Sequence, residues 1–188
     1  MKKEIEARYL NCNVQDIIKK LQNNNATFVG DWLQLRYCYD FTPVRENMWI
    51  RLRTNGVETT LTIKQVESKS VDGTKECEIV VSDFQTTNEL LQILGYYPRS
   101  EQENRRIRYI LDDVEIDIDF WPLIDPFLEF EAKRPEDIKK VCKKLDINFE
   151  DLVTLDVESI YLQCGYKSDT LDHIKLEEYT KNKKYIQE

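Results

Sequence analysis

Short segments in which charged and apolar side chains alternate fill the first two-thirds of the chain. In residues 3–10, for example, Glu4, Glu6 and Arg8 alternate with apolar side chains. This period of two residues is typical of a half-buried β-strand, because successive side chains point to opposite faces of a sheet. The recurring pattern therefore predicts a fold built mainly from strands. We expect strands at residues 3–10, 27–41, 48–54, 58–66, 75–82, 103–111, 114–120 and 127–132.

Apolar residues at helical spacing occur in two inserted segments and in the last third of the chain. Asn13 stands where a side chain would cap the first helix, and Thr86 or Thr87 where one would cap the second. Pro135 suits a first helical turn. We expect helices at residues 14–23, 86–95 and 135–144, and one or two more within 149–165.

The predicted fold class is α+β. Consecutive strands are close enough along the chain to pair with each other, which favours an eight-stranded antiparallel β-barrel with helices packed outside it. No stretch rich in Gly, Pro or Ser divides the 188 residues, and this length suits one domain. We therefore expect a single domain over residues 1–188, with a strand core at about 3–133 and a helical part at about 135–180.

Composition excludes several classes of function. The formal net charge is −8, which disfavours bulk binding to nucleic acid, since that needs a basic surface. His173 is the single histidine and the five cysteines form no CxxC pair, so a zinc site and a Ser-His-Asp triad are disfavoured. The sequence has no apolar stretch of membrane-spanning length, and its first residues lack the apolar core of a secretory signal. We expect a cytoplasmic protein with reduced thiols and no membrane partner.

The charges of the expected strands are sorted by sign. Acidic side chains gather at 3–10, 75–82, 114–120 and 127–132, and basic ones at 48–54, 58–66 and 103–111. One interpretation is that each charged face points to solvent, as in many antiparallel sheets. If helices instead cover the apolar faces, the charged faces line the inside of the barrel, which has room for one small ligand. Carboxylates there suit Mg²⁺ or Mn²⁺, and Arg and Lys suit phosphate oxygens, so the pattern indicates a metal-bound triphosphate.

The segment Glu4-Ile5-Glu6-Ala7-Arg8 resembles the N-terminal ExExK signature of the CYTH domain, the triphosphate tunnel metalloenzymes. Further elements of the family pattern follow in order over about residues 4–133. They are Arg51-Leu52-Arg53, Lys64, Glu76-Cys77-Glu78, Arg106 three residues before Tyr109, Asp119, and Glu129-Phe130-Glu131. Together, these elements in order are far more specific than one ExE run. The family includes inorganic triphosphatases, thiamine triphosphatases and class IV adenylate cyclases.

The resemblance implies a role for each matching residue. The carboxylates that would hold Mg²⁺ or Mn²⁺ or order water are Glu4, Glu6, Glu78 (with Glu76 as its alternative), Asp119, Glu129 and Glu131. The side chains that would bind phosphate oxygens are Arg8, Arg51, Arg53, Lys64, Arg106, Arg108 and Lys133. Direct catalytic roles would fall to Glu4, Glu6, Arg8 and Lys64. Arg8 stands where the signature has Lys, and because Arg is deprotonated far less readily, it is a poor general base.

The function that we expect is metal-dependent hydrolysis of inorganic tripolyphosphate or a small organic triphosphate. In this reaction a water attacks the terminal phosphorus. One alternative is a class IV adenylate cyclase, in which the ribose 3′-oxygen of ATP attacks the α-phosphorus and pyrophosphate leaves. A second alternative is a non-catalytic polyphosphate- or nucleotide-binding module, but the presence of both acidic ExE pairs favours an enzyme.

The partner that we expect is a triphosphate-containing small molecule, bound by a monomer or a homodimer. Five aromatic residues on the expected strands and the following turn are candidates for stacking on an adenine or thiamine ring, or for packing in the core. They are Trp32, Tyr37, Tyr39, Trp49 and Trp121. Aromatic side chains on strands more often belong to the core.

Overall fold

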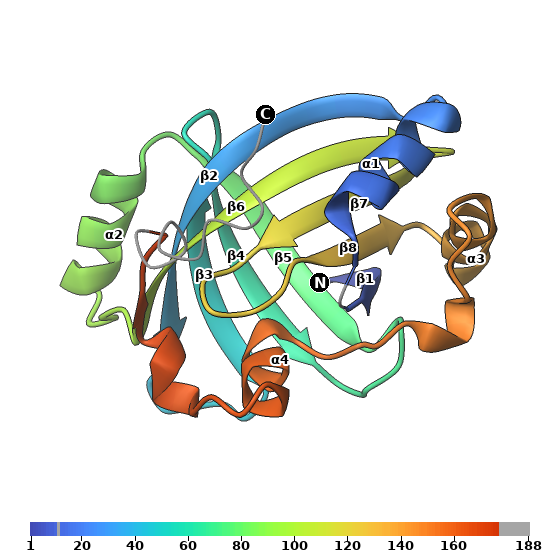
Figure 1. Cartoon of the computed structure of the whole chain (residues 1–188). Coiled ribbons are helices and arrows are strands. Elements are labelled where there is room, and N and C mark those ends of the chain that lie inside the picture. The colour runs from blue at the N-terminus through green and yellow to red at the C-terminus, as the bar shows by residue number, and fades with distance from the viewer. Residues whose placement is uncertain (11, 177–188) are drawn as a thin grey trace.

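The computed structural model describes residues 1–10 and 12–176, and in them eight antiparallel strands close into a barrel (Figure 1). The strands are β1 (Lys2–Tyr9), β2 (Thr27–Asp40), β3 (Met48–Thr54), β4 (Thr59–Val66), β5 (Thr74–Val81), β6 (Ser100–Leu111), β7 (Val114–Phe120) and β8 (Phe127–Ala132). Their order is β2-β3-β4-β5-β1-β8-β7-β6, and pairing between β2 and β6 completes the circle. The predicted α+β barrel is therefore confirmed.

Helices cover part of the outside of the barrel. α1 (Val14–Asn23) and α3 (Pro135–Lys144) pack on β6, β7 and β8, and α2 (Phe84–Ile93) packs near β2 and β3. Ile116 and Phe130 on the strands and Leu21 on α1 are completely buried in the first of these cores. Truncating such a side chain typically costs about 2–5 kcal/mol of stability. The apolar faces of these strands thus point outward, and their other faces point into the barrel.

The helix starts follow local capping chemistry. Asn13 caps α1 as predicted, because its side chain accepts a hydrogen bond from the Asp16 backbone N–H. The second predicted helix is present as α2, but its predicted cap was wrong: the capping residue is Asp83, whose carboxylate accepts from the Thr86 N–H, and the helix begins at Phe84. An ionised Asp is favoured at this position because it also faces the positive end of the helix dipole.

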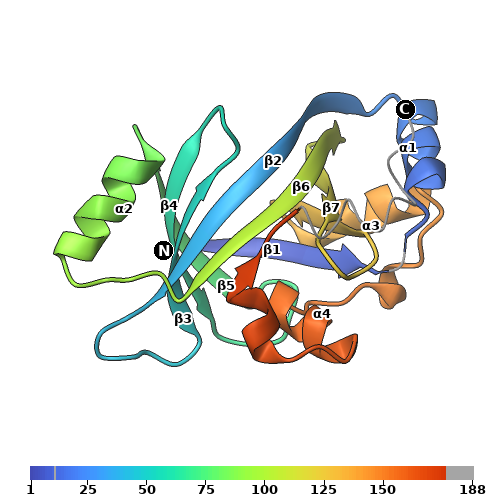
Figure 2. The same cartoon turned by 60° about the vertical axis from the view of Figure 1, so that its left-hand side comes forward.

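The C-terminal segment wraps around one end of the barrel. It contains η1 (Phe149–Asp151), α4 (Val157–Gln163), η2 (Ser168–Leu171) and a short strand, β9 (His173–Ile174), that runs parallel to β6 (Figure 2). Between η1 and α4, Val153 pairs with Arg8 through two backbone hydrogen bonds of 2.8 Å. The sequence predicted the helical turns here but not β9.

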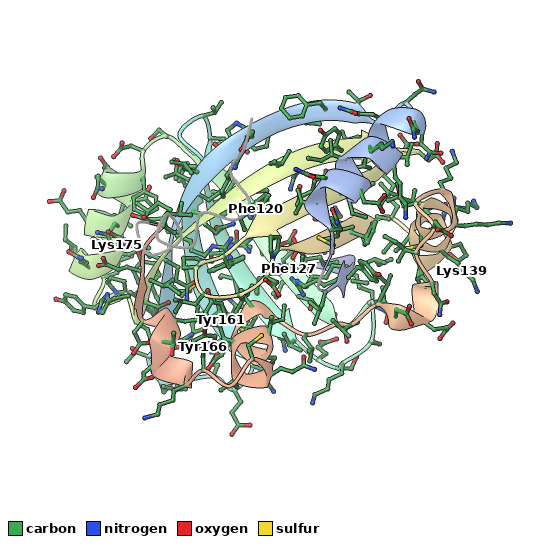
Figure 3. The ribbon with its side chains drawn as sticks, viewed as in Figure 1. Phe120, Phe127, Lys139, Tyr161, Tyr166 and Lys175 are labelled. Atoms are coloured by element: carbon green, nitrogen blue, oxygen red, sulfur yellow. The ribbon has the colours of Figure 1, made fainter. Side chains whose placement is uncertain are left out.

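This segment packs on the turn that follows β7. Trp121 and Phe127 at that turn form a buried cluster with Tyr161 of α4, and Tyr166 lies at its edge (Figure 3). The Tyr166 hydroxyl donates to the backbone oxygen of Leu123 at 2.9 Å. None of the helices in the described ranges has the length and apolar character needed to cross a membrane.

Candidate functional site

The charged faces of the strands meet inside the barrel. Several of their side chains are less than a tenth exposed although they carry a charge. They are Glu4, Arg8, Arg36, Arg51, Lys64, Arg106, Asp117 and Asp119. Burial of so many charges disposes of the interpretation that these faces point to solvent. Since an isolated buried charge costs several kcal/mol, the partners of each group reveal what the site is built to hold.

Three carboxylates form what we call the acid cluster: Glu4, Glu76 and Glu131. One carboxylate oxygen of each lies within 4.8 Å of one from the other two. Lys64 Nζ donates to both oxygens of Glu4 at 2.8 Å, and it lies 3.9 Å from Glu76. Burial and the nearby carboxylates, chiefly Glu4 and Glu115, raise the pKa of Glu131 to about 7. One ammonium thus offsets only part of the negative charge, and this set of hard oxygen ligands fits Mg²⁺ or Mn²⁺.

In a second group of charges, every carboxylate contacts a guanidinium group. Arg106 contacts Asp119 at 2.5 and 2.7 Å, Asp117 at 2.6 Å and Glu129 at 3.0 Å. Arg8 contacts Glu129 at 2.5 Å. Both guanidinium groups hold the pKa of Glu129 well below its ordinary range, although burial alone would raise it. We call this set the ion network; both of its guanidinium groups already contact carboxylates.

Arg8 also ties the ion network to the C-terminal segment. Its Nη1 donates to the backbone oxygen of Leu155 at 2.7 Å, and its Nη2 lies 3.2 Å from Glu6. Burial lowers the pKa of Arg8, but Glu6 and Glu129 outweigh that effect and raise it above the ordinary value. The Arg8 side chain therefore stays protonated and cannot act as a general base.

Two of the predicted phosphate-binding residues, Arg108 and Lys133, lie apart from Arg51 and Arg53. Arg108 contacts Asp117 at 2.7 Å and Glu115 at 2.6 Å, so it extends the ion network toward solvent. Lys133 follows the end of β8, and its side chain is exposed. Neither of them joins Arg51 and Arg53.

Three guanidinium groups form what we call the basic cluster: Arg36, Arg51 and Arg53. Arg36 on β2 pairs directly with Arg53 on β3, and Arg51 lies two residues further along the same strand. Glu78 is the carboxylate that serves this cluster, at 3.5 Å from Arg51 and 3.9 Å from Arg53. Arg51 and burial lower the pKa of Arg53 to about 9. The basic cluster thus carries excess positive charge and suits a multiply charged anion.

Comparison with known proteins places this geometry in a family. The CYTH domain matches residues 2–156. The chain belongs to the CYTH family. A comparison with curated proteins gave no match.

Solved structures share the CYTH fold with this chain. PH1012 from Pyrococcus horikoshii is 25% identical with a TM-score of 0.69, over 81% of this chain and 96% of that one. A candidate adenylate cyclase from Vibrio parahaemolyticus is 12% identical with a TM-score of 0.70, over 86% and 98% of the two chains. HpAC1 from Hippeastrum, a candidate adenylyl cyclase described with a dominant triphosphatase activity, is 16% identical with a TM-score of 0.59, over 89% and 97%.

The acid cluster and the basic cluster of this CYTH domain each include a residue outside the site set preferred from sequence. Glu76, the alternative to Glu78, belongs to the acid cluster, whereas Glu78 lies with the basic cluster. Sequence alternation gives the face of a strand but not the level along it, so it could not separate the two. Arg36 was not expected at all. The signal that could have found it is its alternation with Gln34 within residues 27–41.

The aromatic candidates divide between the core and the barrel interior. Tyr37 stacks edge-on against Phe84, and the buried Tyr39 hydroxyl donates to Asn88 at 2.9 Å. Both belong to the core under α2, and Trp121 is completely buried as well. Two half-buried residues lie on the inner face: Trp32, opposite Arg106, and Trp49, opposite Lys64.

Proposed function

We propose that this CYTH domain hydrolyses a small triphosphate with Mg²⁺ or Mn²⁺ as cofactor. The observation that carries the proposal is the division of one barrel interior into an acid cluster and a basic cluster. A free triphosphate would be repelled by the first, and a free divalent cation by the second. In a triphosphate with a bound divalent cation, the cation matches the charge of the acid cluster and the phosphate groups match that of the basic cluster.

The acid cluster, Glu4, Glu76 and Glu131, would hold the cation. When bound, the cation would neutralise phosphate charge and polarise a phosphate oxygen. Lys64 on β4 holds Glu4 through two hydrogen bonds and would also donate to a phosphate oxygen. Arg51 and Arg53 would bind the remaining phosphate oxygens through their planar, forked donors.

Hydrolysis needs a water and an acceptor for its proton. The water oxygen attacks the terminal phosphorus, the bond from that phosphorus to the bridging oxygen breaks, and orthophosphate and diphosphate form from tripolyphosphate. A carboxylate beside the acid cluster takes the proton, and Glu6 is well placed because it pairs with Glu131 across β1 and β8. Positioning and fixed positive charge supply most of the rate enhancement for such a reaction.

HpAC1, a distant relative of this chain, is described with a dominant triphosphatase activity, and this supports hydrolysis as the proposed reaction. Class IV adenylate cyclase activity is the alternative, and it would need a grip on the adenine. Three of the five aromatic candidates are packed in the core, which leaves Trp32 and Trp49 for that task. A pure binding module needs no acid cluster, and here that cluster is complete.

Product analysis tests the proposal. The protein is incubated with tripolyphosphate, ATP or thiamine triphosphate, each with Mg²⁺ or Mn²⁺, and orthophosphate, pyrophosphate and cyclic AMP are measured. We expect orthophosphate from a triphosphate, and none without the divalent cation. Cyclic AMP with pyrophosphate would instead establish the cyclase. Metal-dependent binding without turnover of any substrate would leave the non-catalytic module.

A further inference from the structure

Arg36 is a buried cation without an acidic partner in residues 1–10 and 12–176. Its side chain is 7% exposed and lies on the inner face of β2. Its Nη2 donates to two neutral amide oxygens, of Gln34 at 3.3 Å and of Asn104 at 3.0 Å, and its Nε finds no acceptor in the described ranges. Within those same ranges, no carboxylate lies within 4.0 Å of its guanidinium group. Arg8 and Arg106, buried to the same degree, each contact two or more carboxylates.

The neighbours of Arg36 make its charge less favourable still. Burial, Arg51 and Arg106 lower the pKa of Arg36 to about 10. A buried arginine that only stabilised the fold would be expected to have a carboxylate partner, because the free energy of burying an unpaired charge is large. A bound anion would supply the missing counter-charge, and it would lie near Arg53 as well, because Arg36 pairs with Arg53 across β2 and β3.

Trp121 fixes where the Arg36 guanidinium points. The guanidinium carbon lies 4.5 Å from the centre of the indole ring, in a cation–π contact. The Trp121 side chain is completely buried, with Tyr161 of α4 packed edge-on against it. Tyr161 in the C-terminal segment thus keeps the Trp121 ring in place, and this ring orients Arg36 before any ligand binds.

We infer that Arg36 is a further triphosphate-binding residue, oriented by Trp121, and that it sets the preference of the basic cluster for a triphosphate over shorter phosphates. This inference rests on the proposed function, because the anion is the triphosphate of that proposal. With Arg36, the basic cluster has three guanidinium groups beside Glu78, and without it the cluster would have two. The added positive charge is matched by an additional phosphoryl group, whereas monophosphate and diphosphate gain less from it.

The test measures binding and stability in the same variants. Arg36→Gln removes the charge, Arg36→Lys keeps it without the fork, and Arg99→Gln removes one charge from an exposed pair with Asp40 as the matched control. Titration calorimetry gives the Kd of tripolyphosphate, diphosphate and monophosphate with Mg²⁺, and thermal unfolding gives the Tm with and without tripolyphosphate. We expect Arg36→Gln to raise the Kd of tripolyphosphate about tenfold, with a smaller change for diphosphate. The ligand-free Tm should not fall, because repulsion with Arg51 is relieved.

Each other outcome has a definite meaning. If Arg36→Gln leaves the Kd of tripolyphosphate unchanged, or raises the Kd of diphosphate as much, the inference is overturned while the proposed function stands. An unchanged Kd with a lower ligand-free Tm would show that Arg36 is structural. If both properties worsen, Arg36→Lys decides: recovered affinity supports the inference, and affinity as low as in Arg36→Gln overturns it. If the unaltered protein binds no triphosphate, both the proposed function and the inference fail.

Discussion

The acid cluster and the basic cluster carry opposite excess charge and adjoin successive inward-facing residue pairs of β4 and β5. Lys64 pairs with Glu76 across β4 and β5, and this rung leads into the acid cluster. The next inner rung pairs Thr62 with Glu78, and it leads into the basic cluster. In the first cluster Lys64 contacts two of the three carboxylates, Glu4 and Glu76, and in the second Glu78 contacts two of the three guanidinium groups, Arg51 and Arg53. Each cluster thus contains one group of the charge that dominates the other.

The ion network shows what directly paired charges look like in the same barrel. There each of three carboxylates, Asp117, Asp119 and Glu129, contacts Arg8 or Arg106 at 3.0 Å or less. Had the two clusters served only to stabilise the barrel, their charges would be matched in the same way, since unmatched buried charge destabilises. Under the proposed function, the excess charges would bind a cation at the acid cluster and an anion at the basic cluster.

The largest expected effect comes from breaking the acid cluster. Glu131→Gln removes one of three candidate cation ligands at nearly constant volume, so we expect kcat for tripolyphosphate to fall by about a hundredfold or more. The exposed Glu89→Gln on α2 is the matched control and should leave kcat unchanged. The measurement is orthophosphate release at several Mg²⁺ and Mn²⁺ concentrations. Full activity in Glu131→Gln would contradict the role of the acid cluster.

The comparison of the two clusters also shows which features the sequence alone can predict: local ones, but not the register between strands. The barrel was predictable because alternation is a local property, and the start of α1 because Asn13 caps it through a neighbouring residue. The pairing of strands brings Glu76, rather than Glu78, to Glu4 and Glu131, and alternation carries no information on that register. β9 spans two residues and depends on a partner about seventy positions away, so no local pattern announces it.

Breaking the basic cluster should produce a smaller effect of a different kind. Arg53→Gln removes a phosphate ligand but leaves the acid cluster intact, so we expect KM for tripolyphosphate to rise about tenfold. The metal concentration needed for half-maximal activity should change little. Steady-state kinetics with separate titrations of substrate and metal measure both quantities. A large change in the metal requirement, with KM unaltered, would show that the two clusters do not divide the ligand as proposed.

Titration of Glu131 tests the excess negative charge without any substrate. The folded state raises the pKa of Glu131 to about 7, from an ordinary value of about 4.3. Between these values the folded state binds the proton more tightly than the unfolded state does. This group therefore makes the free energy of unfolding fall as pH rises from about 4.3 to about 7.

The measurement is Tm against pH in the presence of EDTA. We expect Glu131→Gln to flatten the decline over that range, and bound Mg²⁺ or Mn²⁺ to flatten it in the unaltered protein, because a cation stabilises the ionised carboxylate. An identical slope in Glu131→Gln and the unaltered protein would mean that Glu131 ionises normally in the ligand-free barrel.

The smallest expected effect concerns the ion network, where Arg8→Lys restores the residue of the CYTH signature. Lys keeps the charge beside Glu129 but has no forked donor for the Leu155 oxygen, so the C-terminal segment loses one tie to the barrel. We expect the free energy of unfolding, measured with urea, to fall by about 1–2 kcal/mol. kcat should change little, because Arg8 is already paired with Glu6 and Glu129. A tenfold change in kcat would instead indicate that Arg8 takes part directly in the reaction.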